Sequence, residues 1–234
     1  MSNSSKQTVV VTGASKGLGR FMSLQLLDMG FQVLGCSRSK ASIAHKHFED
    51  IACDVANSED RFALIAHLRK GQYQLYGLVN NAAMGALNQF LTTPTEKVNE
   101  VMQANYIANF ELSREVAKLM MTTGGRIVNI GSQTLTLNTP LEAAYAASKA
   151  AVESLTKISA KELAPLHITV NMVSPGVMHT DIIKGIASDR IDYMLEQQVL
   201  PEPLQFADVW AAVKLLLSNE AHRITGQNIN IGVV

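Results

Sequence analysis

Short apolar runs alternate with longer amphipathic stretches along the whole chain. The first apolar run covers residues 8–12, is rich in β-branched side chains and ends at a glycine. A helical pattern of apolar positions follows over residues 18–29 and ends at Gly30. β-Branched runs of this length are typical of buried strands, whereas apolar positions three and four apart predict a helix that a glycine can terminate. The beginning of the chain therefore predicts a strand, a helix and, over residues 31–37, a second strand.

The same alternation continues to the end of the sequence. The apolar runs predict seven strands, over residues 8–12, 31–37, 50–54, 75–79, 126–130, 167–173 and 228–231. Helical patterns cover residues 18–29, 58–70, 95–121, 142–164 and 205–217. This order predicts right-handed crossovers and an α/β fold of the Rossmann type, in which a doubly wound, mainly parallel sheet carries helices on both faces. Ligands bind such sheets beyond the carboxyl ends of the strands.

Length and composition indicate how many domains the sequence holds. The chain has 234 residues, 47% of them hydrophobic, which is typical of one globular domain and predicts a single domain over residues 1–234. A chain of this length can bury a sizeable core without a disulfide or a structural metal. Cys36 and Cys53 lie in apolar, strand-like stretches. We expect buried, reduced thiols there, with a reactive or bridging role as the alternative.

Charge and hydropathy exclude several classes of partner. The formal net charge is +0 and the sequence pI is ≈ 7.0, so no overall electrostatic attraction favours nucleic acid or an anionic membrane, although a local phosphate site is still possible. Residues 1–7 are polar and do not resemble a signal peptide, and no apolar run approaches the roughly 18 residues that cross a bilayer. His45 and His47 lack further ligands for a metal site. We expect a cytoplasmic protein without metal.

A glycine-rich segment follows the first predicted strand, with the spacing Gly-x-x-x-Gly-x-Gly over residues 13–19. Glycines at a strand-to-helix turn let a pyrophosphate approach the backbone, and the helix N-terminus offers free N–H groups and a partial positive charge. An ordinary glycine turn is the alternative. The interpretation as a nucleotide loop assigns cofactor binding to Gly13, Ser15, Lys16, Gly17, Leu18 and Gly19.

Tyr145 and Lys149 lie four positions apart in a predicted helix, which places them one turn apart on the same face. A free tyrosine has a pKa of about 10 and is a poor acid–base catalyst at neutral pH. A neighbouring ammonium favours the phenolate, so the pair could supply a usable proton donor and acceptor. This spacing also arises by chance in many helices. Ser132, directly after the fifth predicted strand, adds a hydroxyl that could donate to a substrate oxygen.

In combination, these motifs resemble the classical short-chain dehydrogenase/reductase family, and the likeness extends over nearly the whole chain. The residues that carry it, in chain order, are 12–19, 53–55, 80–83, Asn105, Ser132, Tyr145, Lys149, 174–176, Thr180 and 225–227. Each of these elements is weak by itself, whereas the ordered set is specific.

The resemblance implies roles for the catalytic positions. Tyr145 would exchange a proton with the substrate oxygen, which Ser132 would hold. Lys149 would lower the pKa of the tyrosine and bind the nicotinamide ribose. Asn105 would hold a water that links this lysine to solvent; an ordinary surface or satisfied polar residue is the alternative for Asn105.

The resemblance also implies further cofactor contacts. Asp54 and Val55 would flank the adenine ring, and residues 80–83 would border the cofactor and steady the sheet. Asn80 either touches the ligand or only stabilises backbone, and Thr180 also suits a helix N-cap. Besides Tyr145 and Lys149, the implied contacts in these segments are Asp54, Val55, Asn81, Ala82, Pro175, Gly176, Val177 and Thr180.

The end of the second predicted strand bears on the choice of dinucleotide. NAD enzymes of this sheet type usually carry an acidic residue there, which would repel a 2′-phosphate. This chain has Ser37 followed by Arg38, and Lys16 in the glycine loop adds a second positive charge. A guanidinium can pair with phosphate in a forked geometry. We therefore predict NADP(H); the alternative is that Lys16 and Arg38 are solvated surface residues.

The sequence departs from the family pattern at Ala83, where glycine is most common, and at residues 231–234, where many relatives carry an acidic residue and paired glycines. Residues 178–200 are the expected substrate lid. Its apolar side chains favour an apolar substrate or belong to the core; they are Ile182, Ile183, Ile186, Tyr193 and Met194. Relatives commonly form tetramers through the helices predicted at 95–121 and 142–164, so we expect a homo-oligomer, either a dimer or a homotetramer.

The predicted function is that of an NADP(H)-dependent oxidoreductase, a carbonyl reductase or alcohol dehydrogenase that acts on a small-molecule substrate. One alternative is a 3-oxoacyl-[acyl-carrier-protein] reductase, whose substrate is a carrier-bound acyl group. Another is a non-enzymatic dinucleotide-binding sensor, which would not need the catalytic positions. A nucleotide-sugar epimerase fits less well, because such enzymes usually need a larger substrate domain.

Overall fold

A seven-stranded parallel sheet forms the centre of the structure, a computed structural model that describes residues 6–180 and 187–233. The strand order is β3-β2-β1-β4-β5-β6-β7, and every neighbouring pair is parallel. The strands are β1 (Gln7–Thr12), β2 (Gln32–Ser37), β3 (Phe48–Ala52), β4 (Gln74–Asn80), β5 (Gly125–Ile130), β6 (Ile168–Pro175) and β7 (Asn228–Ile231). The predicted doubly wound α/β fold is confirmed.

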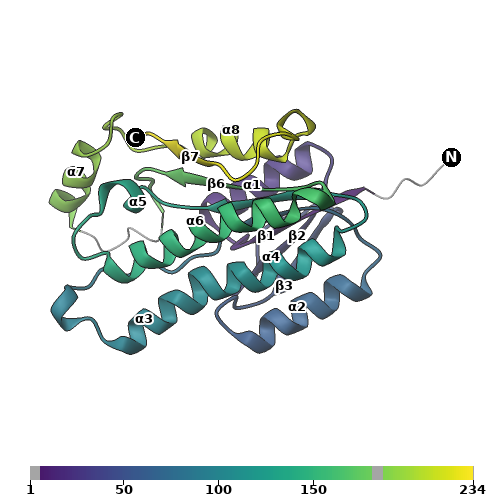
Figure 1. Cartoon of the computed structure of the whole chain (residues 1–234), viewed down its shortest axis with the longest axis horizontal. Coiled ribbons are helices and arrows are strands. Elements are labelled where there is room, and N and C mark those ends of the chain that lie inside the picture. The colour runs from purple at the N-terminus through teal and green to yellow at the C-terminus, as the bar shows by residue number, and fades with distance from the viewer. Residues whose placement is uncertain (1–5, 181–186, 234) are drawn as a thin grey trace.

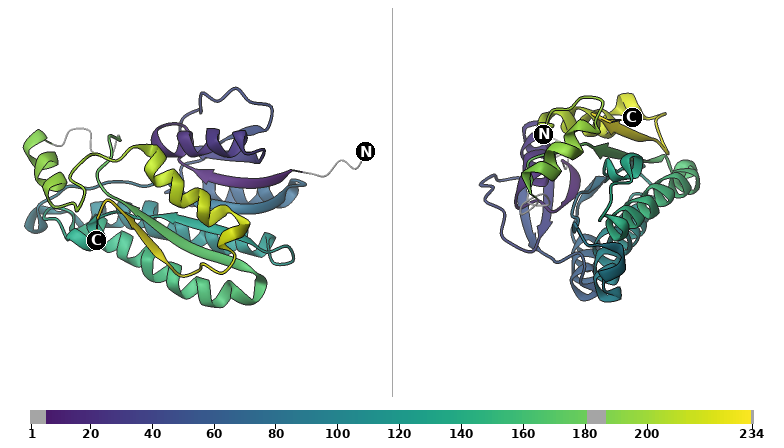
Figure 2. Two further views of the ribbon diagram at one scale, coloured as in Figure 1. Left: turned by 90° about the horizontal axis from the view of Figure 1, so that it is seen from above. Right: turned by 90° about the vertical axis from the view of Figure 1, so that its left-hand side faces the viewer.

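Helices cover both faces of this sheet (Figures 1 and 2). Helices α1 and α8 pack on one face, and α2, α4 and α6 pack on the other. The α-helices are α1 (Gly17–Asp28), α2 (Ser58–Lys70), α3 (Thr95–Met102), α4 (Ala108–Leu119), α5 (Thr134–Leu137), α6 (Ala143–Leu163), α7 (Ser188–Glu196) and α8 (Phe206–Leu217). Shorter turns of helix are η1 (Phe90–Thr92), η2 (Gln103–Ile107), η3 (Ala164–Leu166) and η5 (Asn219–Ala221).

The core consists of two apolar layers, one on each side of the sheet. In β1, Val10 belongs to the layer under α2 and α4, whereas Val9 and Val11 belong to the layer under α1 and α8. Successive side chains of a strand point to opposite faces, so an unbroken apolar run can fill both layers at once. For this reason the central strands appear in the sequence as continuous apolar runs without polar alternation.

The structure corrects several predicted boundaries. The helix expected over residues 95–121 consists of α3, the π-helical turn η2 and α4. Such turns are frequent at functional sites, and this one contains Asn105. Strand β3 covers residues 48–52 and not 50–54, whereas β6 continues to Pro175. The short helices α5 and α7 were not predicted, because they lie in segments interpreted as loop and lid.

Several other expectations concern single residues. Cys36 and Cys53 are buried free thiols, as predicted. Ile182, Ile183 and Ile186 of the expected lid lie outside the described residues. No helix in the described part of the chain is long and apolar enough to cross a membrane. Over the same residues, no three His, Cys, Asp or Glu side chains gather into a group that could hold a metal ion.

Candidate active site

The carboxyl ends of the central strands meet at one edge of the sheet, where the chain connections diverge. Strand β1 lies between β2 and β4, so the connections from this point lead in opposite directions across the sheet. Such a switch point opens a crevice that binds ligands. The loops that follow β1, β4, β5 and β6 all reach this edge, and they carry the residues that the sequence analysis singled out.

The glycine loop connects β1 to α1 by a tight turn against the sheet. Gly13 has φ +70° and Gly17 has φ +54°, values that side chains rarely tolerate. The Gly13 N–H donates to the Cys36 carbonyl at 2.8 Å. A Cβ on Gly19 would lie 2.2 Å from the Gly13 carbonyl oxygen. Because no side chain in the described residues caps the N-terminus of α1, its first N–H groups suit a pyrophosphate.

Thr12 and Asn81 fasten the end of β1 to the end of β4. The Thr12 hydroxyl oxygen accepts from the backbone N–H groups of Asn81 and Ala82, at 2.9 Å each. The Asn81 side-chain amide donates to the Thr12 carbonyl at 2.9 Å. Asn81 and Ala82, predicted as cofactor contacts, thus lie directly against the glycine loop. Their hydrogen bonds hold together the strand ends and the glycine loop, against which a dinucleotide would bind.

Ser37 ends β2 beside the glycine loop. Its hydroxyl donates to the Ser39 carbonyl at 2.8 Å, and the Ser39 hydroxyl donates to the Ser15 hydroxyl at 3.2 Å. Arg38 and Lys16 are both exposed on this side of the loop. The end of β2 therefore presents small hydroxyl groups and two cationic side chains at the place expected to receive the adenosine ribose.

Asp54 and Val55 follow β3, next to the end of β2. The Cys53 N–H donates to the Ser37 carbonyl at 3.0 Å, which holds this loop beside the strand end. The Asp54 carboxylate accepts from the Ala56 N–H at 3.0 Å, and Val55 is buried. Both predicted adenine contacts thus lie at the same end of the crevice as Ser37.

Tyr145 lies in the first turn of α6 and is only 8% exposed. Burial raises the pKa of its phenol to about 12; a hydrogen bond with Ser132 lowers the pKa, and the nearby Glu142 carboxylate raises it. The structure thus brings Tyr145 together with Ser132, as predicted from their positions after β5 and in the helix. With this pKa, the tyrosine is protonated throughout the neutral range and suits the role of proton donor.

Lys149 is buried one turn after Tyr145. Its ammonium donates to the Ile130 carbonyl at 2.7 Å and lies 5.7 Å from the centroid of the Tyr145 ring. Burial lowers the pKa of the lysine to about 8. That Lys149 lowers the pKa of Tyr145 stays a prediction; in this structure the Ile130 carbonyl accepts the hydrogen bond of its ammonium.

Asn105 is fully buried within the π-helical turn. Its side-chain oxygen accepts from the Met84 N–H at 2.7 Å, and its amide donates to the Met84 carbonyl and the Ser148 hydroxyl at 2.9 Å each. Ser148 in turn donates to the Tyr145 carbonyl at 2.7 Å. The alternative prediction that Asn105 is a surface residue is therefore wrong. Its hydrogen bond to Ser148 connects the π-helical turn to α6, the helix that carries Tyr145.

Asn80 is buried and forms hydrogen bonds inside the protein. Its side-chain amide donates to the Ser113 hydroxyl at 3.0 Å and to the Asn129 side-chain oxygen at 2.9 Å, which favours the structural interpretation of this residue. Both partners are buried. A buried amide paired in this way links β4 to β5 and α4 and steadies the strand ends on which the crevice depends.

The loop after β6 lies across the crevice from the glycine loop. The Gly176 N–H donates to the Ile231 carbonyl at 2.9 Å, and the Val177 N–H donates to the Gln198 side chain at 2.5 Å. Pro175 accepts from the Gln133 N–H at 2.9 Å, which connects this loop to the segment after Ser132. Thr180 is half-buried at the end of the loop, and the residues that follow it, on which its predicted role as an N-cap depends, lie outside the described residues.

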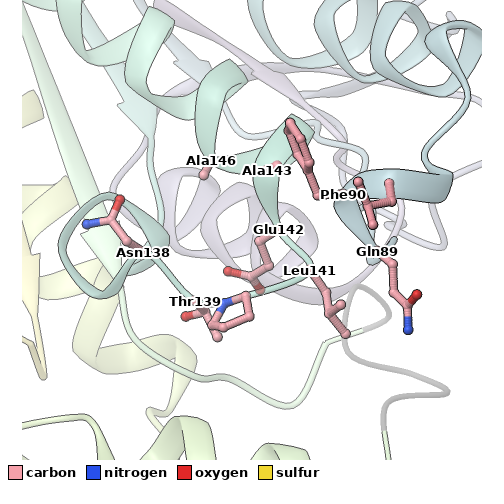
Figure 3. A pocket seen from close by; sticks show the side chains of 10 residues that line it. Gln89, Phe90, Asn138, Thr139, Leu141, Glu142, Ala143 and Ala146 are labelled. Carbon is pink, nitrogen blue, oxygen red and sulfur yellow. The ribbon is translucent and has the colours of Figure 1, made fainter.

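A cavity of ≈ 610 Å³ opens beside the start of α6 (Figure 3). It is lined by Gln89, Phe90, Leu91, Asn138, Thr139, Pro140, Leu141, Glu142, Ala143 and Ala146. Ala143 and Ala146 place the first turns of α6 in its wall, and Tyr145 belongs to the same part of that helix. The sequence analysis missed this wall, because η1 and residues 138–143 are far apart in the chain. One signal was present: Glu142 is an acidic residue one turn before the tyrosine.

Comparison with known proteins agrees with this arrangement. A family model described as short chain dehydrogenase matches residues 7–191. The chain is 32% identical over 239 residues to the 3-oxoacyl-[acyl-carrier-protein] reductase FabG of Staphylococcus epidermidis, with 96% of this chain and 97% of that protein covered. It is 33% identical over 235 residues to the reductase of the same name from Vibrio cholerae, with 96% and 95% covered.

Solved structures show the same fold. A 4-hydroxyisoleucine dehydrogenase complexed with NADH superimposes with a TM-score of 0.89 at 28% identity, covering 97% of this chain and 98% of that chain. The ligand-free aldohexose dehydrogenase of Thermoplasma acidophilum superimposes with a TM-score of 0.86 at 28% identity, covering 97% and 92%. The likeness therefore extends over the sheet, the crevice and the helices that cover them.

Proposed function

The chain belongs to the short-chain dehydrogenase family, and from this premise we propose that it transfers a hydride between NADP(H) and a carbonyl or secondary alcohol. Membership makes it an oxidoreductase that acts on CH–OH or C=O groups. The observation that carries the proposal is the buried Tyr145, which is hydrogen-bonded to Ser132 and lies one turn from Lys149. A cavity opens at the start of the same helix.

The residues present fit a dinucleotide. The glycine loop leaves no room for a side chain at Gly19 and presents the uncapped N-terminus of α1 to a pyrophosphate. When bound, the nicotinamide supplies or accepts the hydride at the carbonyl carbon. Ser132 holds the substrate oxygen, and the protonated Tyr145 donates its proton to that oxygen, which yields the alcohol. Lys149, one turn along the helix, then restores the proton on the tyrosine.

The choice of NADP(H) depends on the end of β2. Ser37 and the exposed Arg38 leave room and positive charge for a 2′-phosphate. One similar solved structure contains NADH, so this choice depends on the residues of this chain. Titration of the purified protein should show at least about tenfold tighter binding of NADPH than of NADH, roughly 1.4 kcal/mol. Arg38→Ala should reduce that ratio, and equal affinities in the unmodified chain would make the assignment wrong.

Replacement of the tyrosine tests the enzymatic proposal. Tyr145→Phe removes the proton donor and keeps the ring, so turnover should fall by roughly 100- to 10,000-fold while NADPH affinity stays the same. Undiminished turnover would refute the role of Tyr145. A wild-type protein that binds NADPH tightly but reduces no carbonyl compound would favour the sensor.

A second candidate function has specific support. Both curated relatives named above are 3-oxoacyl-[acyl-carrier-protein] reductases, at 32% and 33% identity over 96% of this chain. The substrate would then be an acyl group carried as a thioester. Activity on acetoacetyl thioesters with little activity on simple ketones would favour this candidate over a general carbonyl reductase.

A further inference from the structure

Glu142 is the one ionisable residue among the ten that line the cavity at the start of α6. The remaining lining residues are neutral, and most of them are apolar. In Figure 3 the Glu142 side chain lies beside Thr139 on the cavity wall. A carboxylate in such surroundings is costly to bury, so its position calls for an explanation beyond the shape of the cavity.

The Glu142 side chain is held in a defined position. It is 7% exposed, and one carboxylate oxygen accepts from the Thr134 hydroxyl at 2.8 Å. Burial raises the pKa of this carboxyl, while hydrogen bonds with Thr134 and Thr139 and the positive charge of Arg190 lower it. Arg190 belongs to α7 and donates to the Pro140 carbonyl on the cavity wall. These contacts fix the carboxylate before any ligand arrives.

The carboxylate lies close to the reacting centre. Thr134 links it to Ser132: the Thr134 hydroxyl donates to the Glu142 carboxylate at 2.8 Å, and the Thr134 N–H donates to the Ser132 hydroxyl at 3.3 Å. The charge of Glu142 also raises the pKa of the Tyr145 phenol. The carboxylate therefore belongs to the hydrogen-bonded group that includes the residue expected to hold the substrate oxygen.

The Glu142 carboxylate can accept a further hydrogen bond from a donor on a bound ligand. An ionised carboxylate has about four acceptor positions, and the two threonine hydroxyls leave some of them open. A substrate with a plain alkyl chain would strip water from the carboxylate without replacing its hydrogen bonds, at a cost of about 1–3 kcal/mol. A site built to pair with a hydroxyl discriminates strongly against the analogue that lacks it.

On the basis of the oxidoreductase function proposed above, we infer that Glu142 is a substrate-binding residue that accepts a hydrogen bond from a hydroxyl group one or two carbons from the reacting carbonyl. The substrates are then hydroxy ketones and the corresponding diols. Unsubstituted ketones are poorer substrates, and so are 3-oxoacyl thioesters, which carry no donor on the carbons next to the reacting carbonyl.

The test compares ketones that share a carbon skeleton. The value of kcat/KM with NADPH is measured for 2-butanone, 3-hydroxy-2-butanone, 4-hydroxy-2-butanone and acetoacetyl-CoA. We expect the wild-type protein to favour one of the hydroxy ketones over 2-butanone and over acetoacetyl-CoA by tenfold or more. Glu142→Leu should abolish this preference, chiefly through KM. Glu142→Gln keeps the shape and one acceptor, so it should reduce the ratio less.

The control and the contrary results are specific. Glu96→Gln removes an exposed carboxylate on α3, away from the cavity, and should leave the ratio unchanged. A wild-type ratio near one, a ratio unaffected by both Glu142 variants, or acetoacetyl-CoA as the best substrate overturns the inference alone. If the Glu142→Leu variant does not fold, the substrate preference of the Glu142→Gln variant provides the test. Tight NADPH binding with no reduction of any of the four compounds overturns the proposed function as well.

Discussion

The two halves of the crevice are built in different ways. On the cofactor side, backbone atoms and short side chains at strand ends bond to one another, as Thr12 does with Asn81 and Gly13 with Cys36. On the substrate side, the cavity wall contains Asn138 and Leu141 at positive φ. It also includes Phe90, which is 80% exposed. The first half is held by bonds between strand ends, whereas the second is assembled from loop segments and includes an exposed aromatic side chain.

This difference follows from what each half must recognise. The cofactor presents the same phosphate and ribose groups whatever the substrate is. A short motif with a fixed backbone geometry is therefore enough to bind them. A substrate is recognised by particular side chains such as Glu142, which gather from separate segments. Changes on the cofactor side should therefore act through the backbone and damage binding and folding together. Changes on the substrate side should alter KM with little effect on stability.

Lys149 lies where the two halves meet, and its replacement should have the largest effect. Lys149→Met should reduce turnover by roughly 100-fold or more, because the proton pathway to Tyr145 is lost. The folded pKa of about 8 lies below the usual 10.5, so the buried charge destabilises the fold at pH values below about 8. The variant should therefore be more stable than the wild type by about 2–3 kcal/mol at pH 7.

The stability difference between the variant and the wild type decreases as pH rises. As pH rises from about 8 to 10.5, the folded wild type loses the proton before the unfolded chain does, and the penalty disappears. Urea unfolding at pH 7 and at pH 10.5 measures the difference between the two proteins at each pH. A variant that is less stable than the wild type at pH 7 would contradict the burial penalty.

Gly19→Ala should have the next largest effect, on the cofactor side. Its Cβ would lie 2.2 Å from the Gly13 carbonyl oxygen, so the loop must shift. We expect NADPH affinity to fall by about 100-fold, or roughly 2.7 kcal/mol, with a loss of stability. Gly30→Ala is the matched control: its φ of +92° makes alanine strained, but no atom lies within 4 Å of the added Cβ. Its stability should fall by about 1 kcal/mol with NADPH affinity unchanged.

Phe90→Ala should have the smallest effect, on the substrate side. The side chain is 80% exposed, so unfolding free energy should change by less than about 0.5 kcal/mol. Loss of one apolar wall should raise KM for ketones by roughly two- to fivefold, about 0.4–1 kcal/mol. Phe62 on α2 is 76% exposed and outside the cavity, so Phe62→Ala should leave KM unchanged. Equal KM changes in the two variants would remove the distinction between the halves.

Much of the fold and of the cofactor side could be predicted from local patterns. Short runs of apolar residues, continuous in the central strands and interrupted by polar residues in β3 and β7, located all seven strands. The glycine spacing located the turn after β1. The helical spacing of Tyr145 and Lys149 became informative only together with Ser132 and the other motifs of the ordered set. The break in the helix around Asn105 could not be predicted, because its cause is a set of hydrogen bonds to Met84 and Ser148, which are distant in the chain.

By itself, then, the sequence determined the succession of strands and helices of a doubly wound sheet and the glycine loop after the first strand, since each depends on periodicity or on neighbours within a few residues. The ordered set of motifs along the chain pointed to the candidate proton donor. The tertiary structure decided the protonation of that donor, the partner of Lys149 and the wall of the cavity. Burial sets the pKa of Tyr145 and of Lys149, and burial is a property of the packed chain. The position of Glu142 opposite η1 likewise exists only once segments far apart in the sequence have come together.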